Sequence, residues 1–259
     1  MEHDPKISEE SFMTAADQPV PWGIAEAFSV WFLFLVIQLI AGFVVGLVYG
    51  IAHHSTFNNI KMPTGWVLTL SSVFSMCTIL FLLWAMLRIS YRLPFREGIR
   101  WAGSKEKNRE ALLVGLLIST ANMIFTILFP PVNPEKVPLY EIIKTPTDLA
   151  VFAIFAVTVA PIGEELLFRG WMYPAFRKKM SAWAAILVTT ALFAAPHAFQ
   201  LGEYKMGIVL VGLLGLVNGI LREKTGGVKA PFMCHLAYNS VLVIMEILSR
   251  VRVMGLQLP

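Results

Sequence analysis

Residues 24–52 read IAEAFSVWFLFLVIQLIAGFVVGLVYGIA, an apolar stretch longer than the ~20 residues with which a helix crosses a bilayer. The rest of the chain has the same character: 56% of the 259 residues are hydrophobic, 15% are charged, and the mean hydropathy is +0.66. A soluble domain of this size has too small a core to hide so much apolar surface, so the expected solvent is a lipid bilayer. Since a backbone in lipid must satisfy its own hydrogen bonds, we expect an all-α fold, a polytopic membrane helical bundle.

Apolar stretches recur almost to the C-terminus and predict about seven transmembrane helices. A proline-rich outer loop at 130–147 separates three leading spans from four later ones. We therefore expect a disordered acidic cytoplasmic tail (1–22), three leading transmembrane helices with a basic cytoplasmic loop (23–147), and a catalytic core of four transmembrane helices (148–259). The expected spans lie at about 24–52, 65–88, 110–129, 148–176, 181–198, 206–221 and 228–248.

The Lys and Arg residues between the spans predict the orientation of the chain. With the N-terminus in the cytoplasm, the inner segments carry 15 of the 21 basic residues and the outer segments carry 6. Cytoplasmic loops are enriched in Lys and Arg, so we expect the N-terminus inside and the C-terminus outside. The same bias accounts for the net charge of +4, and we therefore expect a lipid bilayer and no nucleic acid as partner.

Ionisable side chains gather in the later spans. Such a group at the middle of a membrane helix costs roughly 2.5–3.5 kcal/mol on insertion scales, so each one needs a partner or a function. The sequence reads PIGEELLFRG at 161–170, FAAPH at 193–197 and HLAYN at 235–239. This clustering predicts a functional site within the membrane.

Helical spacing assigns different tasks to the two adjacent glutamates. Glu164 and Glu165 point about 100° apart around a helix, whereas Arg169, four residues after Glu165, lies on the same face as Glu165. That pairing would keep Glu165 ionised and structural, and would leave Glu164 free to act as a general base. His235 and Asn239 are also four residues apart, so both project from one stripe of the last span and can address one substrate atom together.

A comparison of depths connects the fourth and fifth spans. They form an antiparallel hairpin whose turn lies near residues 179–181 at the inner face. Glu164 and His197 stand at nearly equal sequence distances from that turn, so at a rise of about 1.5 Å per residue they reach nearly the same level. We expect them to meet in a cavity nearer the cytoplasmic side, which water can reach.

These motifs resemble those of the CPBP family, the CAAX proteases and bacteriocin-processing enzymes also called the Abi family, and are similar to those of type II CAAX prenyl endopeptidases. The family signature is a double glutamate with an arginine four residues after the second, a Phe-x-x-x-His on the next helix, and a later His-x-x-x-Asn or His-x-x-x-Asp. The resemblance covers about residues 148–248. All three motifs occur here in that order, as Glu164-Glu165-x-x-x-Arg169, Phe193-x-x-x-His197 and His235-x-x-x-Asn239.

The resemblance implies an intramembrane endopeptidase that hydrolyses a peptide bond of a membrane-associated protein or peptide. In that reading Glu164 and His197 activate water, and His235 and Asn239 stabilise the oxyanion. Donors aimed at the developing negative charge are what a tetrahedral intermediate requires. Because the chain is short beside the eukaryotic enzymes, it looks like a prokaryotic member, and the plasma membrane is the expected location.

The residues leave the cofactor open between none and zinc. Two histidines and a glutamate can form a zinc set, and the candidate ligands are Glu164, His197 and His235. The family resemblance fits water activation without a metal equally well.

Two other classes of protein remain as alternatives. A proton-coupled membrane transporter also uses carboxylates with nearby His and Arg, although the chain shows no internal repeat of the kind that carriers display. A catalytically silent peptide-binding or immunity protein would keep the cavity without turnover. The intact set of Glu164, His197, His235 and Asn239 argues against the silent protein.

Overall fold

The computed structural model describes residues 19–54, 64–133, 136–138 and 142–254, the last four of these by backbone alone. Within these ranges the secondary structure is helical and contains no strand, which confirms the all-α prediction. The elements are α1 (Ile24–Ala52), α2 (Gly65–Ala85), η3 (Met86–Ser90), α3 (Phe95–Gly98), α4 (Lys105–Leu128), α6 (Pro146–Ile154), η5 (Phe155–Val159), α7 (Ala160–Glu165), η6 (Leu166–Met172), α8 (Tyr173–Arg177), α9 (Ala182–Ala194), α10 (His197–Leu201), α11 (Lys205–Thr225) and α12 (Lys229–Met254).

Six of the described helices are long and apolar enough to cross a membrane. The predicted fifth span, 181–198, is instead the 13-residue helix α9 followed by a turn and the short α10. At about 1.5 Å per residue, α9 is about 20 Å long, which is shorter than a hydrocarbon core of about 30 Å. The bundle is polytopic as expected, and the short span reflects the helix break that precedes His197.

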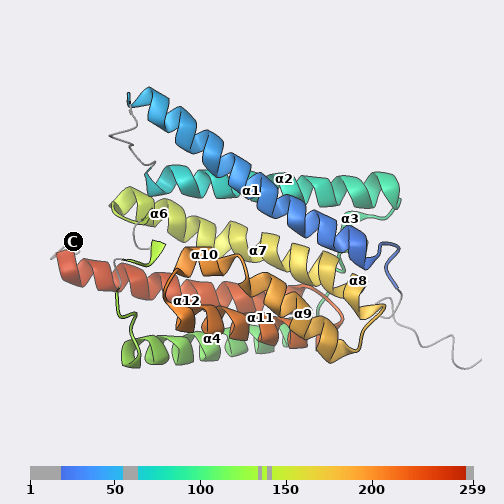
Figure 1. Cartoon of the computed structure of the whole chain (residues 1–259). Helices are drawn as coiled ribbons and strands as arrows, with labels where there is room; N and C mark the ends of the chain where they lie inside the picture. Colours follow the sequence, from blue (N-terminus) through green and yellow to red (C-terminus); the bar gives the residue numbers. More distant parts are fainter. Residues whose placement is uncertain (1–18, 55–63, 134–135, 139–141, 255–259) are drawn as a thin grey trace, which may run out of the picture.

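The helix between Pro146 and Arg177 forms the centre of the bundle (Figure 1). It contacts α1 and α2 on one side and α11 and α12 on the other, while α4 packs against α12 and α9 packs against α11. Two π-helical segments, η5 and η6, interrupt it on either side of α7. The motif that carries Glu164 therefore lies in the middle of the molecule, between helices from both halves of the chain.

A capping box starts this central helix. The hydroxyl of Thr145 accepts a hydrogen bond from the Asp148 backbone N–H, and the Asp148 carboxylate accepts one from the Thr145 N–H at 2.9 Å. The same carboxylate also accepts the backbone N–H of Trp66 at 2.8 Å. Asp148 thus satisfies free donors at the starts of two helices and ties α2 to the central helix.

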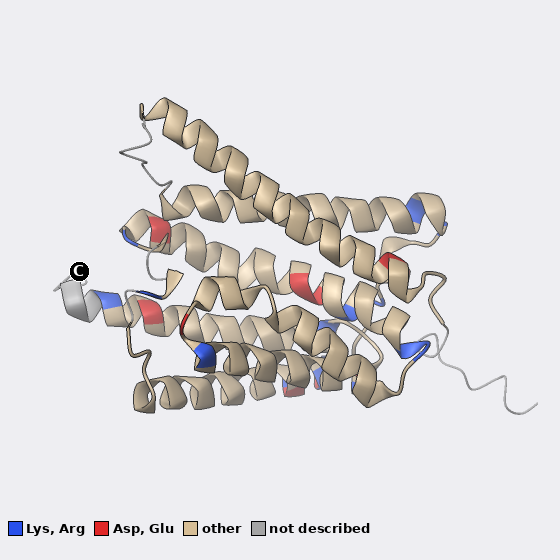
Figure 2. Cartoon of the chain, viewed as in Figure 1, with Lys and Arg blue, Asp and Glu red and all other residues tan. Residues whose placement is uncertain are grey.

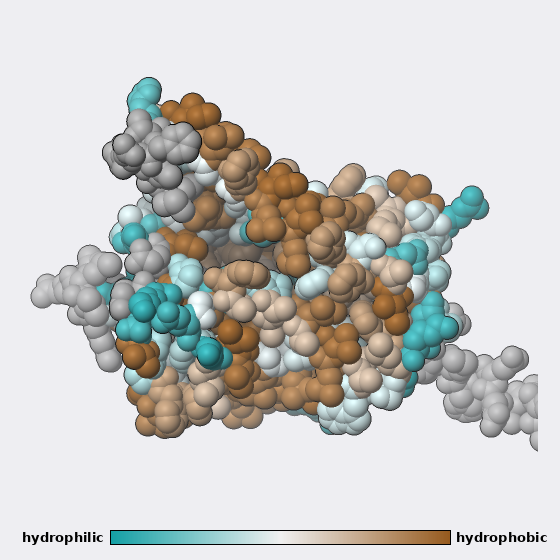
Figure 3. Space-filling model, in the orientation of Figure 1, coloured by the Kyte–Doolittle hydropathy of each residue, from teal (hydrophilic) through white to brown (hydrophobic). Residues whose placement is uncertain are grey.

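The outer surface of the bundle is apolar, as a bilayer requires. On α1 the side chains of Phe32, Leu39 and Phe43 are 57%, 73% and 71% exposed. Hydrophobic residues cover much of the visible face in Figure 3, and Figure 2 shows most Lys and Arg residues toward the ends of the helices. An exposed apolar surface of this extent marks contact with lipid, so this is an integral membrane protein. The orientation of the termini stays a prediction.

The last residues of the predicted N-terminal tail pack against the bundle. Residues 1–18 of the predicted tail lie outside the described residues, but Val20 and Trp22 are buried. The Trp22 ring stacks on Trp171 with centroids 4.2 Å apart, and Lys178 Nζ donates to the carbonyls of Val20 and Trp22 at 2.7 and 2.8 Å. An aromatic stack and a cation therefore hold residues 20–22, the end of the predicted tail, against the central helix.

The contact between α4 and α12 is close enough to require a glycine. A Cβ atom on Gly115 would lie 2.2 Å from the backbone oxygen of Cys234 on α12. We expect Gly115→Ala to push the two helices apart and to lower the free energy of unfolding by about 1–3 kcal/mol. The midpoint of thermal denaturation in detergent measures the effect. Gly42→Ala is the control, because a Cβ there meets nothing within 4 Å, and an equal loss in both variants would contradict the close-contact explanation.

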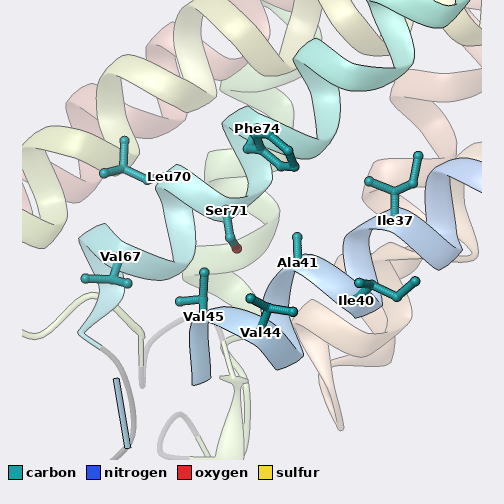
Figure 4. A pocket seen from close by; sticks show the side chains of 9 residues that line it. All are labelled: Ile37, Ile40, Ala41, Val44, Val45, Val67, Leu70, Ser71 and Phe74. Atoms are coloured by element: carbon teal, nitrogen blue, oxygen red, sulfur yellow. The ribbon is translucent and has the colours of Figure 1, made fainter. Parts of the chain in front are cut away.

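An apolar cavity of about 410 Å³ lies between α1 and α2 (Figure 4). Its lining consists of aliphatic and aromatic side chains with one hydroxyl, that of Ser71. No acid or base faces it, and none of the residues predicted to carry chemistry belongs to its lining. This cavity is therefore separate from the candidate site.

Candidate active site

The two adjacent glutamates of α7 lie in different environments. Glu165 is completely buried, whereas the Glu164 side chain is 18% exposed. Acidic residues appear in Figure 2 on α7, in the middle of a bundle that is otherwise largely without charge. The difference follows from the angle between neighbouring helix positions, and it leaves Glu164 as the carboxylate that a substrate or water can reach.

The negative charge of the Glu165 carboxylate is balanced by side chains from three helices. Arg169 approaches it with two nitrogens, each 3.3 Å from a carboxylate oxygen, which confirms the predicted pairing. Asn218 on α11 donates to Oε1 at 2.9 Å, and His235 on α12 places Nδ1 2.8 Å from the same oxygen. A buried carboxylate with this set of donors can remain ionised, so Glu165 serves as the anchor that holds three helices together.

His235 lies between the two glutamates. Since a carboxylate only accepts, Nδ1 donates to Glu165, and the other ring nitrogen, Nε2, faces Glu164 Oε2 at 3.8 Å. That second distance is too long for a hydrogen bond and leaves Nε2 able to address another atom. Glu165 therefore orients the His235 ring, and the Glu164 carboxylate lies next to the ring nitrogen that makes no hydrogen bond.

Phe193 and His197 come from the end of α9 and the start of α10. His197 Nδ1 lies 2.9 Å from the carbonyl oxygen of Phe193, so this nitrogen donates and Nε2 is left as the basic one. The Phe193 ring centroid lies 5.1 Å from the His197 ring and 5.9 Å from the His235 ring, and the Arg169 guanidinium carbon lies 4.9 Å from the same centroid. Phe193 thus contacts both histidines and packs against the ion pair.

The structure does not form the direct contact expected between His197 and Glu164. Neither a hydrogen bond nor an ion pair joins the two side chains, both of which belong to the described residues. The depth comparison assumed regular α-helices, but π-helical segments flank α7 and the fifth span breaks before His197. Each irregularity changes the rise and rotation of the chain and displaces side chains from the levels that a straight helix gives.

Asn239 lies one turn after His235 on α12, as predicted, but its amide is already engaged. Asn239 Nδ2 donates to the carbonyl oxygen of Ala156 in η5 at 2.7 Å. An amide nitrogen carries two hydrogens, so a second one remains for another acceptor.

The proposed metal ligands do not form a metal site. No group of three His, Cys, Asp or Glu side chains in the described part of the chain lies close enough to hold an ion. Zinc in enzymes needs three protein ligands on one centre. The side chains of Glu164, His197 and His235 therefore do not lie close enough together to share one ion.

Sequence reasoning left two contributors from α11 without a role. Asn218 and Arg222 are both buried, and both bind the motif around Glu165 and Arg169. Their spacing in the sequence could have indicated this role. Asn218 and Arg222 are four residues apart, as are Glu165 and Arg169 and also His235 and Asn239.

Comparison with known proteins finds a family whose sequence model matches the later helices of the chain. Residues 146–241 match the family described as "Type II CAAX prenyl endopeptidase Rce1-like", which confirms the resemblance carried by the three motifs. This segment runs from the start of the central helix through Asn239 on α12.

Two curated relatives match parts of the chain. An "Uncharacterized 24.3 kDa protein" from Escherichia coli is 30% identical over 110 residues, which is 41% of this chain and 48% of that protein. A "Putative membrane peptidase YdiL" from Bacillus subtilis (strain 168) is 29% identical over 94 residues, which is 36% of each chain. The matches thus cover less than half the length of either relative. No solved structure matches the chain.

Proposed function

Starting from the match of residues 146–241 to a family of type II CAAX prenyl endopeptidases, we propose that this chain hydrolyses a peptide bond of a membrane-associated protein or peptide. One observation carries the proposal. An accessible carboxylate, Glu164, faces the free nitrogen of an imidazole that a fully buried carboxylate, Glu165, holds in place. A base beside an oriented donor is the arrangement that water activation and oxyanion stabilisation require.

Glu164 acts as the general base. It takes a proton from a water molecule as the water oxygen bonds to the carbonyl carbon of the substrate, and the carbonyl becomes a tetrahedral oxyanion. His197 assists from the other side of the water through Nε2, the ring nitrogen that its Nδ1–H bond to Phe193 leaves basic.

His235 and Asn239 stabilise the oxyanion. His235 donates from Nε2, which requires that the ring carry both of its protons, and Asn239 donates the amide hydrogen that Ala156 does not take. The carbon–nitrogen bond then breaks, and the protonated Glu164 returns its proton to the departing amine. Atoms and charges balance, because water adds hydroxide to the acyl carbon and a proton to the nitrogen.

The test is cleavage of a quenched peptide library by the full chain in lipid nanodiscs, with the products identified by mass spectrometry. Fragments that arise at one bond are expected, and their absence with every peptide would favour the transport or silent-binding alternatives. Because the candidate ligands form no three-residue set, cleavage is expected to persist after incubation with a strong zinc chelator. A loss that added zinc restores would contradict the metal-free reaction.

A further inference from the structure

The π-helical turn η5 leaves one carbonyl without a backbone donor. Its closing bond runs from the Ala160 N–H to Phe155 O, five residues earlier. The next bond of that pattern would run from residue 161 to Ala156 O, but Pro161 has no N–H. Since Ala160 is already directed to Phe155, a side chain takes the place of the backbone donor: Asn239 binds Ala156 O at 2.7 Å.

The second π-helical segment, η6, repeats the arrangement. Its closing bond runs from the Tyr173 N–H to Phe168 O, and the residue that follows is Pro174. The carbonyl that residue 174 would have bound is that of Arg169. Arg222 on α11 donates from Nε to this oxygen at 3.0 Å.

Helices α11 and α12 each bind the segment that contains Glu164 and Glu165 through two side chains four residues apart. On α11, Asn218 binds the Glu165 carboxylate and Arg222, four residues later, binds a carbonyl left free by a proline. On α12, His235 binds the same carboxylate and Asn239, four residues later, binds the other such carbonyl. The segment that contains both glutamates is therefore tied at each end and at its centre.

We propose that Arg222 is a positioning residue for the reaction, and that Pro174 creates its acceptor. Together with the bond of Asn239 to Ala156, the bond of Arg222 to Arg169 O fixes the rotation and axial position of α7, and with them the direction in which Glu164 points. Packing alone does not account for an arginine at this place. The side chain is 2% exposed, and its Nη2 has no hydrogen-bond partner among the described residues, so a neutral side chain would fill the space at lower cost.

The inference rests on the proposed peptidase function and is tested with the full chain in nanodiscs on a peptide that the wild type cleaves. Arg222→Met removes the donor, and kcat is expected to fall about tenfold to a hundredfold with KM within about twofold, because a small displacement of the base slows the reaction without removing substrate contacts. Arg222→Gln keeps an N–H at the position of Nε and is expected to retain most of kcat. Arg177→Met is the control, since this arginine at the end of α8 is 45% exposed and binds Glu223.

A rescue experiment separates positioning from packing. Pro174→Ala restores a backbone N–H that can bind Arg169 O, so adding it to Arg222→Met is expected to recover kcat. An unchanged kcat in Arg222→Met, or a loss that Pro174→Ala does not recover, overturns the inference. If Arg222→Met alone does not fold, the Pro174→Ala variant is compared with the Pro174→Ala, Arg222→Met double variant. A lower kcat in the double variant than in Pro174→Ala would then contradict the inference. A wild type that cleaves no peptide overturns the proposed function instead.

Discussion

Replacing Glu164 with glutamine is expected to lower kcat for peptide cleavage by about 10²–10⁴-fold, the range that a positioned general acid–base supplies. The glutamine amide has nearly the same shape but cannot take a proton from water or return one to the leaving amine. Because the 18% exposed Glu164 side chain makes no hydrogen bond within the described residues, the fold should not depend on its charge. Initial rates at saturating peptide give kcat, and thermal denaturation reports on the fold.

The matched control for this variant is Glu110→Gln on α4. That glutamate is 51% exposed and paired with Lys107, so the same chemical change occurs on the surface and should leave kcat unaltered. Wild-type kcat in a folded Glu164→Gln protein would rule out the base role of Glu164. That result would also favour the alternatives in which the protein is a transporter or a peptide-binding protein.

Arg169→Met is expected to cost about 3–5 kcal/mol of stability, the usual penalty for breaking one side of a buried ion pair. The side chains of Arg169 and Glu165 are 1% and 0% exposed, so the glutamate would remain as a buried charge without its guanidinium partner. The substitution also removes the donor of the 2.6 Å hydrogen bond to the carbonyl of Gly215 on α11. The midpoint of denaturation in detergent is expected to fall sharply.

Two further variants identify the buried charge as the cause. Adding Glu165→Gln to Arg169→Met removes the uncompensated charge and should recover part of the loss. Arg177→Met breaks the exposed pair with Glu223, at 3.3 Å, and should cost no more than about 1 kcal/mol. A double variant less stable than Arg169→Met, or an equal loss in Arg177→Met, would contradict the explanation.

Local spacing in the sequence predicted the parts of the site that belong to one helix. The ion pair between Glu165 and Arg169 follows from a separation of four residues, and so does the common stripe of His235 and Asn239. The contrast between Glu164 and Glu165 also follows, because neighbouring positions on a helix cannot face the same way. The motif order further identified the segment that the family match covers.

Contacts between helices were predicted less well. Equal depth placed Glu164 against His197, whereas the structure turns His197 to the carbonyl of Phe193 and fixes His235 on Glu165. A constant rise per residue does not describe π-helical turns or a span that breaks. Residue spacing also does not predict which ring nitrogen of a histidine is hydrogen-bonded.

Hydropathy and local periodicity in the sequence determined the class of this protein and the pairs along each helix, because lipid forces backbone hydrogen bonds to form within helices and the helix repeat brings residues four apart onto one face. The tertiary structure decided which side chains from other helices bind the buried carboxylate of Glu165. It also decided that Asn239 and Arg222 take the carbonyls that Pro161 and Pro174 leave free. Those bonds join residues 53 and 83 positions apart, and only the packing of α11 and α12 against the central helix brings such partners together.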